Sequence, residues 1–238
     1  MKILYADINE FETEYLKGLV SKERLERSLK YRQEEDVKRS LLAEALLNYG
    51  IKDMYPDVAV PVIPEIDEYK KPHVYTKTGE INYSISHSGD YVVCVISDKP
   101  AGIDIEKIGE NNTRVAKRFY TDMENQYVTG AASFYNIWTL KESFMKIMGL
   151  GMKLPMDAFT VTDLNTASGE CRYAQTNHEL DSVLMKRLEA TGNIYGKIIE
   201  FPDAKYALSL CGYLPMGDIS IRKINEAFLN KILDNYQG

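Results

Sequence analysis

The stretch Ala101-Gly-Ile-Asp-Ile-Glu106 alternates apolar and acidic residues, a period that is typical of a β-strand. On a strand, Asp104 and Glu106 project from one face while Ile103 and Ile105 point to the other. Neighbouring carboxylates repel each other unless a positive charge lies between them, and a hard divalent cation such as Mg²⁺ takes such oxygen ligands. An edge strand with a solvated acidic face shows the same pattern, so this stretch alone leaves both interpretations open.

The composition limits the classes of protein to which the chain could belong. It has 238 residues, a formal net charge of -6 and 45% hydrophobic residues, enough for one large domain or two small ones. The acidity argues against nucleic acid as a partner. We expect a cytoplasmic protein with no membrane partner, because no apolar run is long enough for a membrane span and the first residues lack a signal-peptide pattern. Cys94, Cys171 and Cys211 are predicted to be reduced thiols.

The second informative stretch is a predicted helix over residues 132–148. It is apolar on nearly all sides, which indicates a buried helix, yet it carries Lys141, Glu142 and Lys146. Burying charges is costly unless they are paired or hold an ion. Glu142 and Lys146 could pair with each other at i, i+4, or both could face a ligand that carries a metal and phosphate.

Two further helices are predicted near the N-terminus, over residues 21–31 and 36–49. The first is dense in basic residues, among them Arg24 and Arg27, which raises the hypothesis of an anion site. Several Glu-to-Lys or Glu-to-Arg pairs at i, i+4 explain the same charges as a solvated helix, and the spacing alone favours this explanation. The second helix has an apolar stripe, and Gly50 is its predicted C-terminal stop.

Residues 81–86 and 91–97 are predicted strands, joined by the hairpin turn Ser86-His-Ser-Gly-Asp90. Two hydroxyls and an imidazole in a turn suit anion binding, but they suit ordinary turn hydrogen bonds equally well. Upstream, Lys71 precedes Pro72, which forces an extended backbone there. A lone pair of lysines at this point is usually just surface.

The remaining pattern predicts the fold class. Thr121 and Glu124 form a predicted capping box, which is a sufficient structural reason for this glutamate. We predict an α+β protein with an N-terminal half over residues 1–100 and a C-terminal half over residues 101–238, which ends in a tail helix. The other predicted elements are strands at 2–7, 159–162, 194–200, 206–211 and 219–221, and helices at 114–119, 181–189 and 225–236.

Two of these stretches, Gly102–Glu106 and Trp138–Lys146, together resemble the signature of the 4'-phosphopantetheinyl transferases. Three shorter matches, Ser86-His-Ser88, Lys71-Pro72 and Arg39-Ser40, fit the same family. The similarity runs from about residue 24 to residue 159, and the length resembles the surfactin-synthetase-activating type. It implies a monomeric pseudodimer of two similar α/β halves, each a small, mostly antiparallel sheet packed against a long helix. The sequence departs from the family pattern at Lys70, where glycine is usual, and at Ser84, where asparagine is common.

The resemblance implies a role for each matching residue. Asp104, Glu106 and Glu142 are expected to bind Mg²⁺, or Mn²⁺, with the pyrophosphate of coenzyme A. Glu142 is the implied base, and Glu124 falls on an acidic position that some schemes place near the metal. Residues 112–127 are the family's usual docking region for the carrier protein. The implied coenzyme A contacts are Lys146 on the pyrophosphate, Ser86 and His87 at the nucleotide, Arg24, Arg27 and Ser40 around the 3'-phosphate, Lys71 at the adenine edge, and Arg39.

The implied reaction moves the 4'-phosphopantetheine group from coenzyme A to a serine of an apo peptidyl or acyl carrier protein and releases adenosine 3',5'-bisphosphate. Two other functions remain open at this point. A metal-dependent phosphodiesterase could use the same carboxylates on water, and a non-catalytic module could bind coenzyme A or a carrier protein. A nucleoside-triphosphate enzyme is disfavoured, because the sequence contains no Gly-x-x-x-x-Gly-Lys-Ser/Thr loop.

Overall fold

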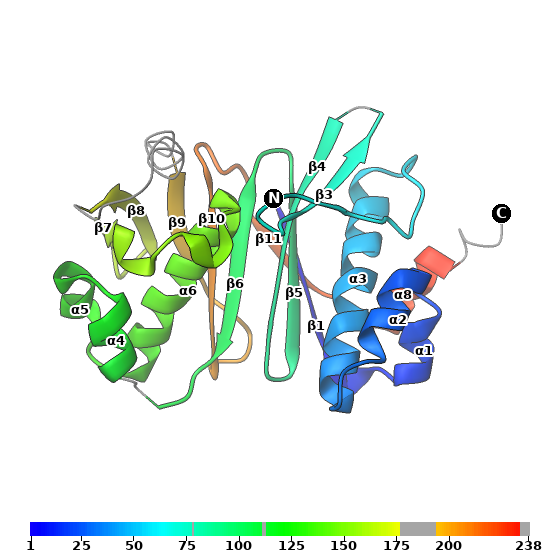
Figure 1. Cartoon of the computed structure of the whole chain (residues 1–238), viewed down its shortest axis with the longest axis horizontal. Coiled ribbons are helices and arrows are strands. Elements are labelled where there is room, and N and C mark those ends of the chain that lie inside the picture. Colours follow the sequence, from blue (N-terminus) through cyan, green and yellow to red (C-terminus); the bar gives the residue numbers. More distant parts are fainter. Residues whose placement is uncertain (78, 111–112, 177–193, 234–238) are drawn as a thin grey trace. The chain divides into compact units, whose positions relative to one another are not determined.

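The computed structural model describes residues 1–77, 79–110, 113–176 and 194–233 (Figure 1). The chain divides into two compact units, each made of segments that are distant in sequence. Unit 1 comprises Met1–Asp67, Pro72–Asp98 and Asp218–Gly238, and unit 2 comprises Glu68–Lys71 and Lys99–Gly217.

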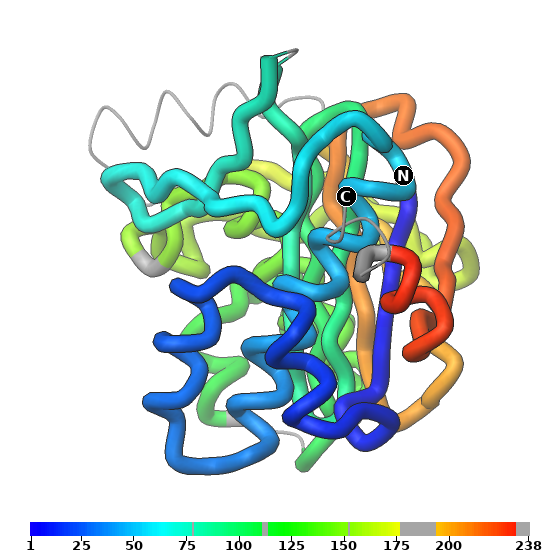
Figure 2. Tube along the Cα trace, turned by 90° about the vertical axis from the view of Figure 1, so that its right-hand side faces the viewer, coloured from blue at the N-terminus to red at the C-terminus, as the bar shows by residue number. Residues whose placement is uncertain are grey.

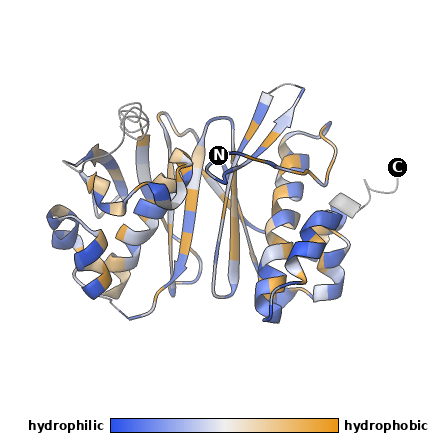
Figure 3. Cartoon of the chain, viewed as in Figure 1, coloured by the Kyte–Doolittle hydropathy of each residue, from blue (hydrophilic) through white to orange (hydrophobic). Residues whose placement is uncertain are grey.

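Unit 1 consists, among the described residues, of a six-stranded sheet with helices. The strand order is β11 (Ser220–Lys223), β1 (Lys2–Asp7), β5 (Tyr91–Ser97), β4 (Gly79–Ser88), β3 (Pro72–Thr76) and β2 (Glu65–Ile66). Its helices are η1 (Ile8–Glu10), α1 (Thr13–Lys17), α2 (Lys22–Ser28), α3 (Glu34–Met54) and α8 (Glu226–Leu233). The β1–β11 pair is parallel and the other pairs are antiparallel. Strand β5 is mainly hydrophobic (Figure 3). It is buried along nearly its whole length.

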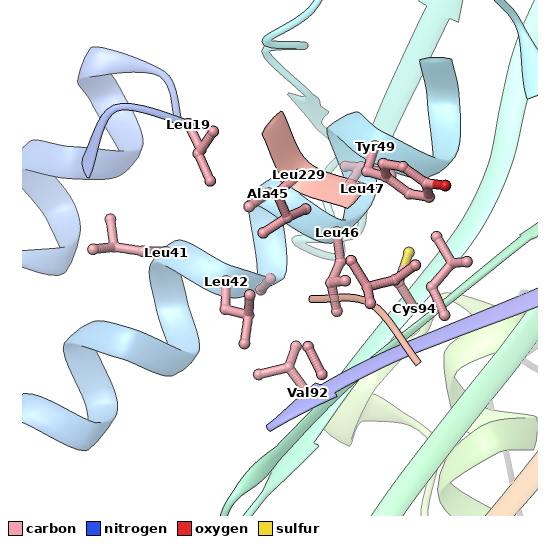
Figure 4. Packing of buried hydrophobic residues seen from close by; sticks show 14 of the residues in the cluster. Leu19, Leu41, Leu42, Ala45, Leu46, Leu47, Tyr49, Val92, Cys94 and Leu229 are labelled. Atoms are coloured by element: carbon pink, nitrogen blue, oxygen red, sulfur yellow. The ribbon is translucent and has the colours of Figure 1, made fainter. Parts of the chain in front are cut away.

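Helix α3 supplies one side of the hydrophobic core of unit 1. Its predicted apolar stripe is buried, and Leu42, Leu46 and Tyr49 belong to the same cluster as Val92 and Cys94 of β5 (Figure 4). The 3.6-residue period of the stripe explains why one face of the helix meets the sheet.

The predicted helix stop at Gly50 is wrong, because α3 continues to Met54. A Cβ added at Gly50 would lie 2.2 Å from Ile96 Cδ1 and 2.8 Å from Leu4 Cδ1. This glycine therefore marks a close approach of helix to sheet and does not cap the helix.

Unit 2 repeats the same plan with a different sheet. Its strands, all antiparallel to their neighbours among the described residues, are β6 (Ala101–Lys107), β10 (Tyr206–Tyr213), β9 (Ile194–Ile199), β8 (Glu170–Gln175) and β7 (Phe159–Thr162). Its helices are α4 (Thr113–Phe119), α5 (Asp122–Tyr127), α6 (Ala131–Met148), η2 (Gly151–Lys153) and η3 (Met156–Ala158). Helix α6 packs on β6 and β10 and buries Phe144 against Phe159. Each unit is thus a mostly antiparallel sheet with a long helix, which confirms the predicted α+β class.

The chain path differs from the predicted division into residues 1–100 and 101–238. The last segment lies in unit 1, because β11 pairs with β1 and α8 packs on α3. Figure 2 shows this C-terminal segment beside the blue N-terminal strand. The predicted helix at 181–189 lies outside the described residues, and the predicted tail helix is described as α8 up to Leu233. No helix in the described part of the chain is long and apolar enough to cross a membrane.

Candidate functional site

Strand β6 and helix α6 of unit 2 are in direct backbone contact at Gly102. A Cβ at this position would lie 2.0 Å from the carbonyl oxygen of Ser143 and 3.0 Å from the amide nitrogen of Ile147. Only glycine fits such an approach, because any side chain would have to push the helix backbone away. The contact brings the acidic end of β6 beside the charged residues of α6.

Three carboxylates from these two elements share one electrostatic environment. Asp104 is buried, whereas Glu106 on β6 and Glu142 on α6 are half-buried. Burial raises the pKa of Glu142, the charges of Asp104 and Glu106 raise it further, and Lys146 lowers it. The acidic group therefore carries mutual repulsion that a cation would relieve.

Lys146 enters this acidic cluster from one turn further along α6. Its Nζ donates to Asp104 Oδ1 at 2.8 Å and to the carbonyl oxygen of Ile103 at 3.0 Å. The side chain of Asp104 is 5% exposed and that of Lys146 is 29% exposed. The cluster thus holds an ammonium group that is partly accessible to an incoming anion.

The chemistry of these donors fits a divalent metal ion, but the orientation of the side chains does not form a ready-made site. Among the described residues, no group of three or more His, Cys, Asp or Glu side chains is arranged to hold a metal. Asp104, Glu106 and Glu142 offer only hard oxygen atoms, the ligands that Mg²⁺ and Mn²⁺ prefer. Because no such group is formed, binding of one ion by all three carboxylates would require their side chains to reorient.

Glu124 and Lys141 lie in the core of unit 2, and both side chains are 0% exposed. Lys141 Nζ donates to Glu124 Oε1 at 2.6 Å and to the carbonyl oxygen of Phe159 at 2.8 Å. The same Glu124 oxygen accepts from the amide of Val161, and the other accepts from the amide of Thr121, each at 2.8 Å. The predicted capping box is confirmed.

None of these contacts of Glu124 and Lys141 involves Asp104, Glu106 or Glu142. Burial lowers the pKa of Lys141, and Glu124 partly offsets that effect. Both oxygens of Glu124 accept hydrogen bonds inside the core, so this carboxylate is a structural partner and is not placed to act as the base. The charge of Lys141 is likewise paired with Glu124 inside the core.

The predicted phosphate-binding residues of unit 1 are tied to its own helices. Arg24 Nε donates to Glu44 Oε2 at 3.0 Å, and the hydroxyl of Ser28 donates to that of Ser40 at 2.8 Å. Arg27 is exposed on α2. Glu44 was not among the predicted residues, although an acidic residue on the apolar stripe of a helix is a signal for a buried ion pair.

Ser86 and His87 lie within strand β4 and not in a turn, contrary to the prediction. The β4–β5 ladder continues as far as the pair between Ser88 and Tyr91, so the turn consists of Gly89 and Asp90 alone. Ser86 is buried and His87 is exposed, as the alternation of a strand requires.

Arg39 closes this hairpin turn onto helix α3. Its Nη1 donates to the carbonyl oxygen of Gly89 at 2.6 Å, and its Nη2 donates to Asp36 Oδ1 at the same distance. The structure therefore gives Arg39 a structural role in unit 1, independent of any ligand.

Two of the predicted coenzyme A contacts among the described residues, Lys146 and Lys71, lie in unit 2 with the acidic cluster. Lys71 lies in the Glu68–Lys71 segment of unit 2, and its Nζ donates to the carbonyl oxygen of Ile147 at 3.3 Å. The C-terminal end of α6 therefore carries a second ammonium group.

The predicted docking region is described from residue 113 onward. Tyr120 is buried, and the half-buried Val115 and Phe119 pack against the cluster that contains Phe134. Core packing accounts for these aromatic and aliphatic side chains, while Met123 on α5 is 46% exposed.

Comparisons with known proteins give a consistent result over both units. A family model described as the 4'-phosphopantetheinyl transferase superfamily matches residues 100–211, and one described as 4'-phosphopantetheinyl transferase, N-terminal, matches residues 9–99. The 4'-phosphopantetheinyl transferase Sfp of Bacillus subtilis (strain 168) is 33% identical over 171 residues, or 68% of this chain and 76% of that protein. A 4'-phosphopantetheinyl transferase of Bacillus subtilis is 33% identical over 63% of this chain and 69% of its own length. The 4'-phosphopantetheinyl transferase gsp of Aneurinibacillus migulanus is 35% identical over 62% of this chain and 63% of its own.

Proposed function

The chain belongs to the 4'-phosphopantetheinyl transferase family, and from that premise we propose that it transfers the 4'-phosphopantetheine group of coenzyme A to a serine of an apo peptidyl or acyl carrier protein. The observation that carries the proposal is the cluster of Asp104, Glu106, Glu142 and Lys146 at the contact of β6 with α6. A site for phosphoryl transfer needs groups that align and neutralise a pyrophosphate, and this cluster supplies them.

Asp104, Glu106 and Glu142 are the residues that would hold Mg²⁺ or Mn²⁺. When bound, such an ion neutralises charge on the pyrophosphate oxygens as a Lewis acid. The carboxylates of this chain would fix the position of the ion. Their mutual repulsion favours binding of a cation at this place and disfavours binding of an anion.

Lys146 provides the positive charge that the chain itself supplies. Its side chain is 29% exposed, so its ammonium group can exchange one contact with Asp104 for a phosphate oxygen. Charge that develops on the leaving adenosine 3',5'-bisphosphate is then stabilised by a donor that is already in place.

Glu142 is the proposed base. Burial and the neighbouring charge of Asp104 raise its pKa, which makes the ionised carboxylate a stronger proton acceptor than that of an ordinary glutamate. The serine hydroxyl gives its proton to this carboxylate, directly or through water. Its oxygen forms the new bond to phosphorus as the bond to the adenosine bisphosphate breaks.

The test is incubation with coenzyme A, Mg²⁺ and a panel of apo carrier proteins, followed by measurement of the intact carrier mass. We expect one phosphopantetheine addition on at least one carrier, and none with a folded Asp104→Ala variant. Consumption of coenzyme A without a carrier would indicate the phosphodiesterase, and binding of coenzyme A without any turnover would indicate the binding module. A monomer acting in the cytoplasm remains a prediction, and sedimentation analysis tests its first part.

A further inference from the structure

The Glu68–Lys71 segment is docked on the end of helix α6. It belongs to unit 2, although the residues on both sides of it belong to unit 1. The Tyr69 ring packs with the core cluster of unit 2, and Lys153 Nζ lies 4.6 Å from the centre of that ring. Lys70 has a φ of 66°, a left-handed conformation that favours glycine. Lys71 is therefore preceded by a residue in the left-handed conformation and by a tyrosine that packs on unit 2.

Gly149 forms the seat for the Lys71 side chain. It ends α6 in the left-handed conformation, with a φ of 68°, and its amide donates to the carbonyl oxygen of Met145 at 3.0 Å. A Cβ at Gly149 would lie 2.6 Å from Lys71 Cδ and 3.4 Å from Lys71 Nζ. The lysine side chain thus occupies the space that a side chain at position 149 would need.

The end of the helix also holds the ammonium group. Lys71 Nζ donates to the carbonyl oxygen of Ile147, one of the last carbonyls of α6, which have no amide partner within the helix. The partial negative charge at a helix C-terminus attracts a cation at this point. Backbone shape and helix charge therefore act on the same side chain.

We propose that Gly149 is a positioning residue that seats Lys71 on the end of α6, so that its ammonium group is already ordered when the anionic nucleotide of coenzyme A arrives. The proposal rests on the proposed function. It ties the lysine to the helix that carries Glu142 and Lys146, and it lowers the entropy lost when coenzyme A binds.

The experiment compares Gly149→Ala with Gly151→Ala. Gly151 also has a left-handed backbone, with a φ of 53°, but a Cβ there would meet nothing closer than the carbonyl oxygen of Tyr69 at 3.9 Å. Both changes strain the backbone, and only the first displaces Lys71. We expect Gly149→Ala to raise the KM for coenzyme A about fivefold to tenfold, with kcat within about twofold, and Gly151→Ala to stay near wild type in both.

Two further variants distinguish displacement of the Lys71 side chain from a general loss of folding. Gly149→Asn restores tolerance of the left-handed backbone but keeps the Cβ, so it is expected to reproduce the KM effect even if Gly149→Ala folds poorly. In a Lys71→Ala background, the change at Gly149 is expected to add little, because no side chain remains to be displaced. Calorimetric binding of coenzyme A without a carrier protein gives the same comparison independently of transfer.

The outcomes distinguish the two proposals. Equal KM values for the Gly149 and Gly151 variants, or additive effects of the Gly149 and Lys71 changes, would overturn the seat while leaving the transferase in place. A wild-type protein that neither binds coenzyme A nor modifies any carrier would overturn both.

Discussion

At the residue scale, Gly102 sets the distance between strand β6 and helix α6. Its missing side chain lets the Ser143 carbonyl oxygen come within 2.0 Å of where a Cβ would stand. Two residues further, Asp104 meets Lys146 of the same helix. The glycine and the first acid of the motif are thus linked, because the approach at Gly102 determines which charges of α6 the acid can reach.

We expect Gly102→Ala to destabilise the protein by about 1–3 kcal/mol, because the new methyl group meets backbone atoms that cannot rotate away. Urea unfolding measures the change. Gly130→Ala is the matched control, since Gly130 lies at the start of the same helix with nothing within 4 Å of an added Cβ. A Gly102 variant as stable as the Gly130 variant would mean that the close approach is absent.

A divalent metal is expected to stabilise the protein against heat. The carboxylates that raise the pKa of Glu142 would lose their repulsion around a cation. Binding at about 100 times the Kd adds about 2.7 kcal/mol of stability. Thermal unfolding with MgCl₂ or with EDTA measures the effect, and Asp104→Asn is expected to lose most of it. An equal metal-induced rise in Tm for wild type and Asp104→Asn would place the ion elsewhere.

At the scale of elements, the buried pair of Glu124 and Lys141 joins three of them. Glu124 lies on α5, Lys141 lies on α6, and together they hold the backbone of Phe159 and Val161 at strand β7. Neither charge reaches water, so each is stable only while the other contacts persist. The pair therefore holds α6 against β7 at Lys141, the residue that precedes Glu142 in the sequence.

Lys141→Met is expected to cost about 3–5 kcal/mol of unfolding free energy, because it leaves Glu124 charged and buried. The double variant with Glu124→Gln is expected to cost less than the sum of the single changes, since it removes the stranded charge. Lys197→Met is the control. Its partner Glu170 is 57% exposed, and exposed pairs contribute about 0–1 kcal/mol. Additive costs for the double variant would contradict the coupling.

Local pattern predicted the elements better than their connections. The apolar helix now described as α6, the acidic strand β6 and the stripe of α3 follow from periodicity, and the structure has all three. The residue types predict a turn at Ser86, because serine, glycine and aspartate are common turn residues, but ladder pairing with β5 extends the strand past it. A glycine after an apolar stripe predicts a helix end at Gly50, because sequence cannot show that a sheet approaches the helix there.

The same limit applies to the candidate site. The acids and Lys146 could be identified from the combined motif, but the contact of Lys146 with Asp104 spans distant positions in sequence. The partner of Lys141 was not predicted either, because Glu124 lies on another helix, 17 positions earlier in the chain. Pairing between elements is a property of the packed fold, which periodicity does not encode.

At the scale of the whole molecule, the chain leaves unit 1, builds unit 2 and then returns to unit 1. Strand β11 pairs in parallel with β1, the N-terminal amine of Met1 donates to the carbonyl oxygen of Asp218, and the amide of Ile224 donates to Tyr5. A parallel pair formed by the two ends of a chain has no local signature. For this reason the pattern of the sequence predicts that the C-terminal tail helix belongs to the half over residues 101–238.

The return of the chain makes the C-terminal helix a component of the unit 1 core. Leu229 of α8 is 0% exposed within the cluster that includes Tyr49, and the Phe228 ring lies 5.9 Å from the Tyr49 ring. Leu229→Ala is therefore expected to cost about 2–5 kcal/mol. Amide hydrogen exchange is expected to show faster opening of β1 and β5, with β6 and β10 unchanged. Ile221→Ala on β11, at a side chain that is 37% exposed, is expected to leave both units protected. If Leu229→Ala instead exposed β6 and β10 equally, the two units would unfold as one body, and the tail would stabilise the whole chain and not unit 1 alone.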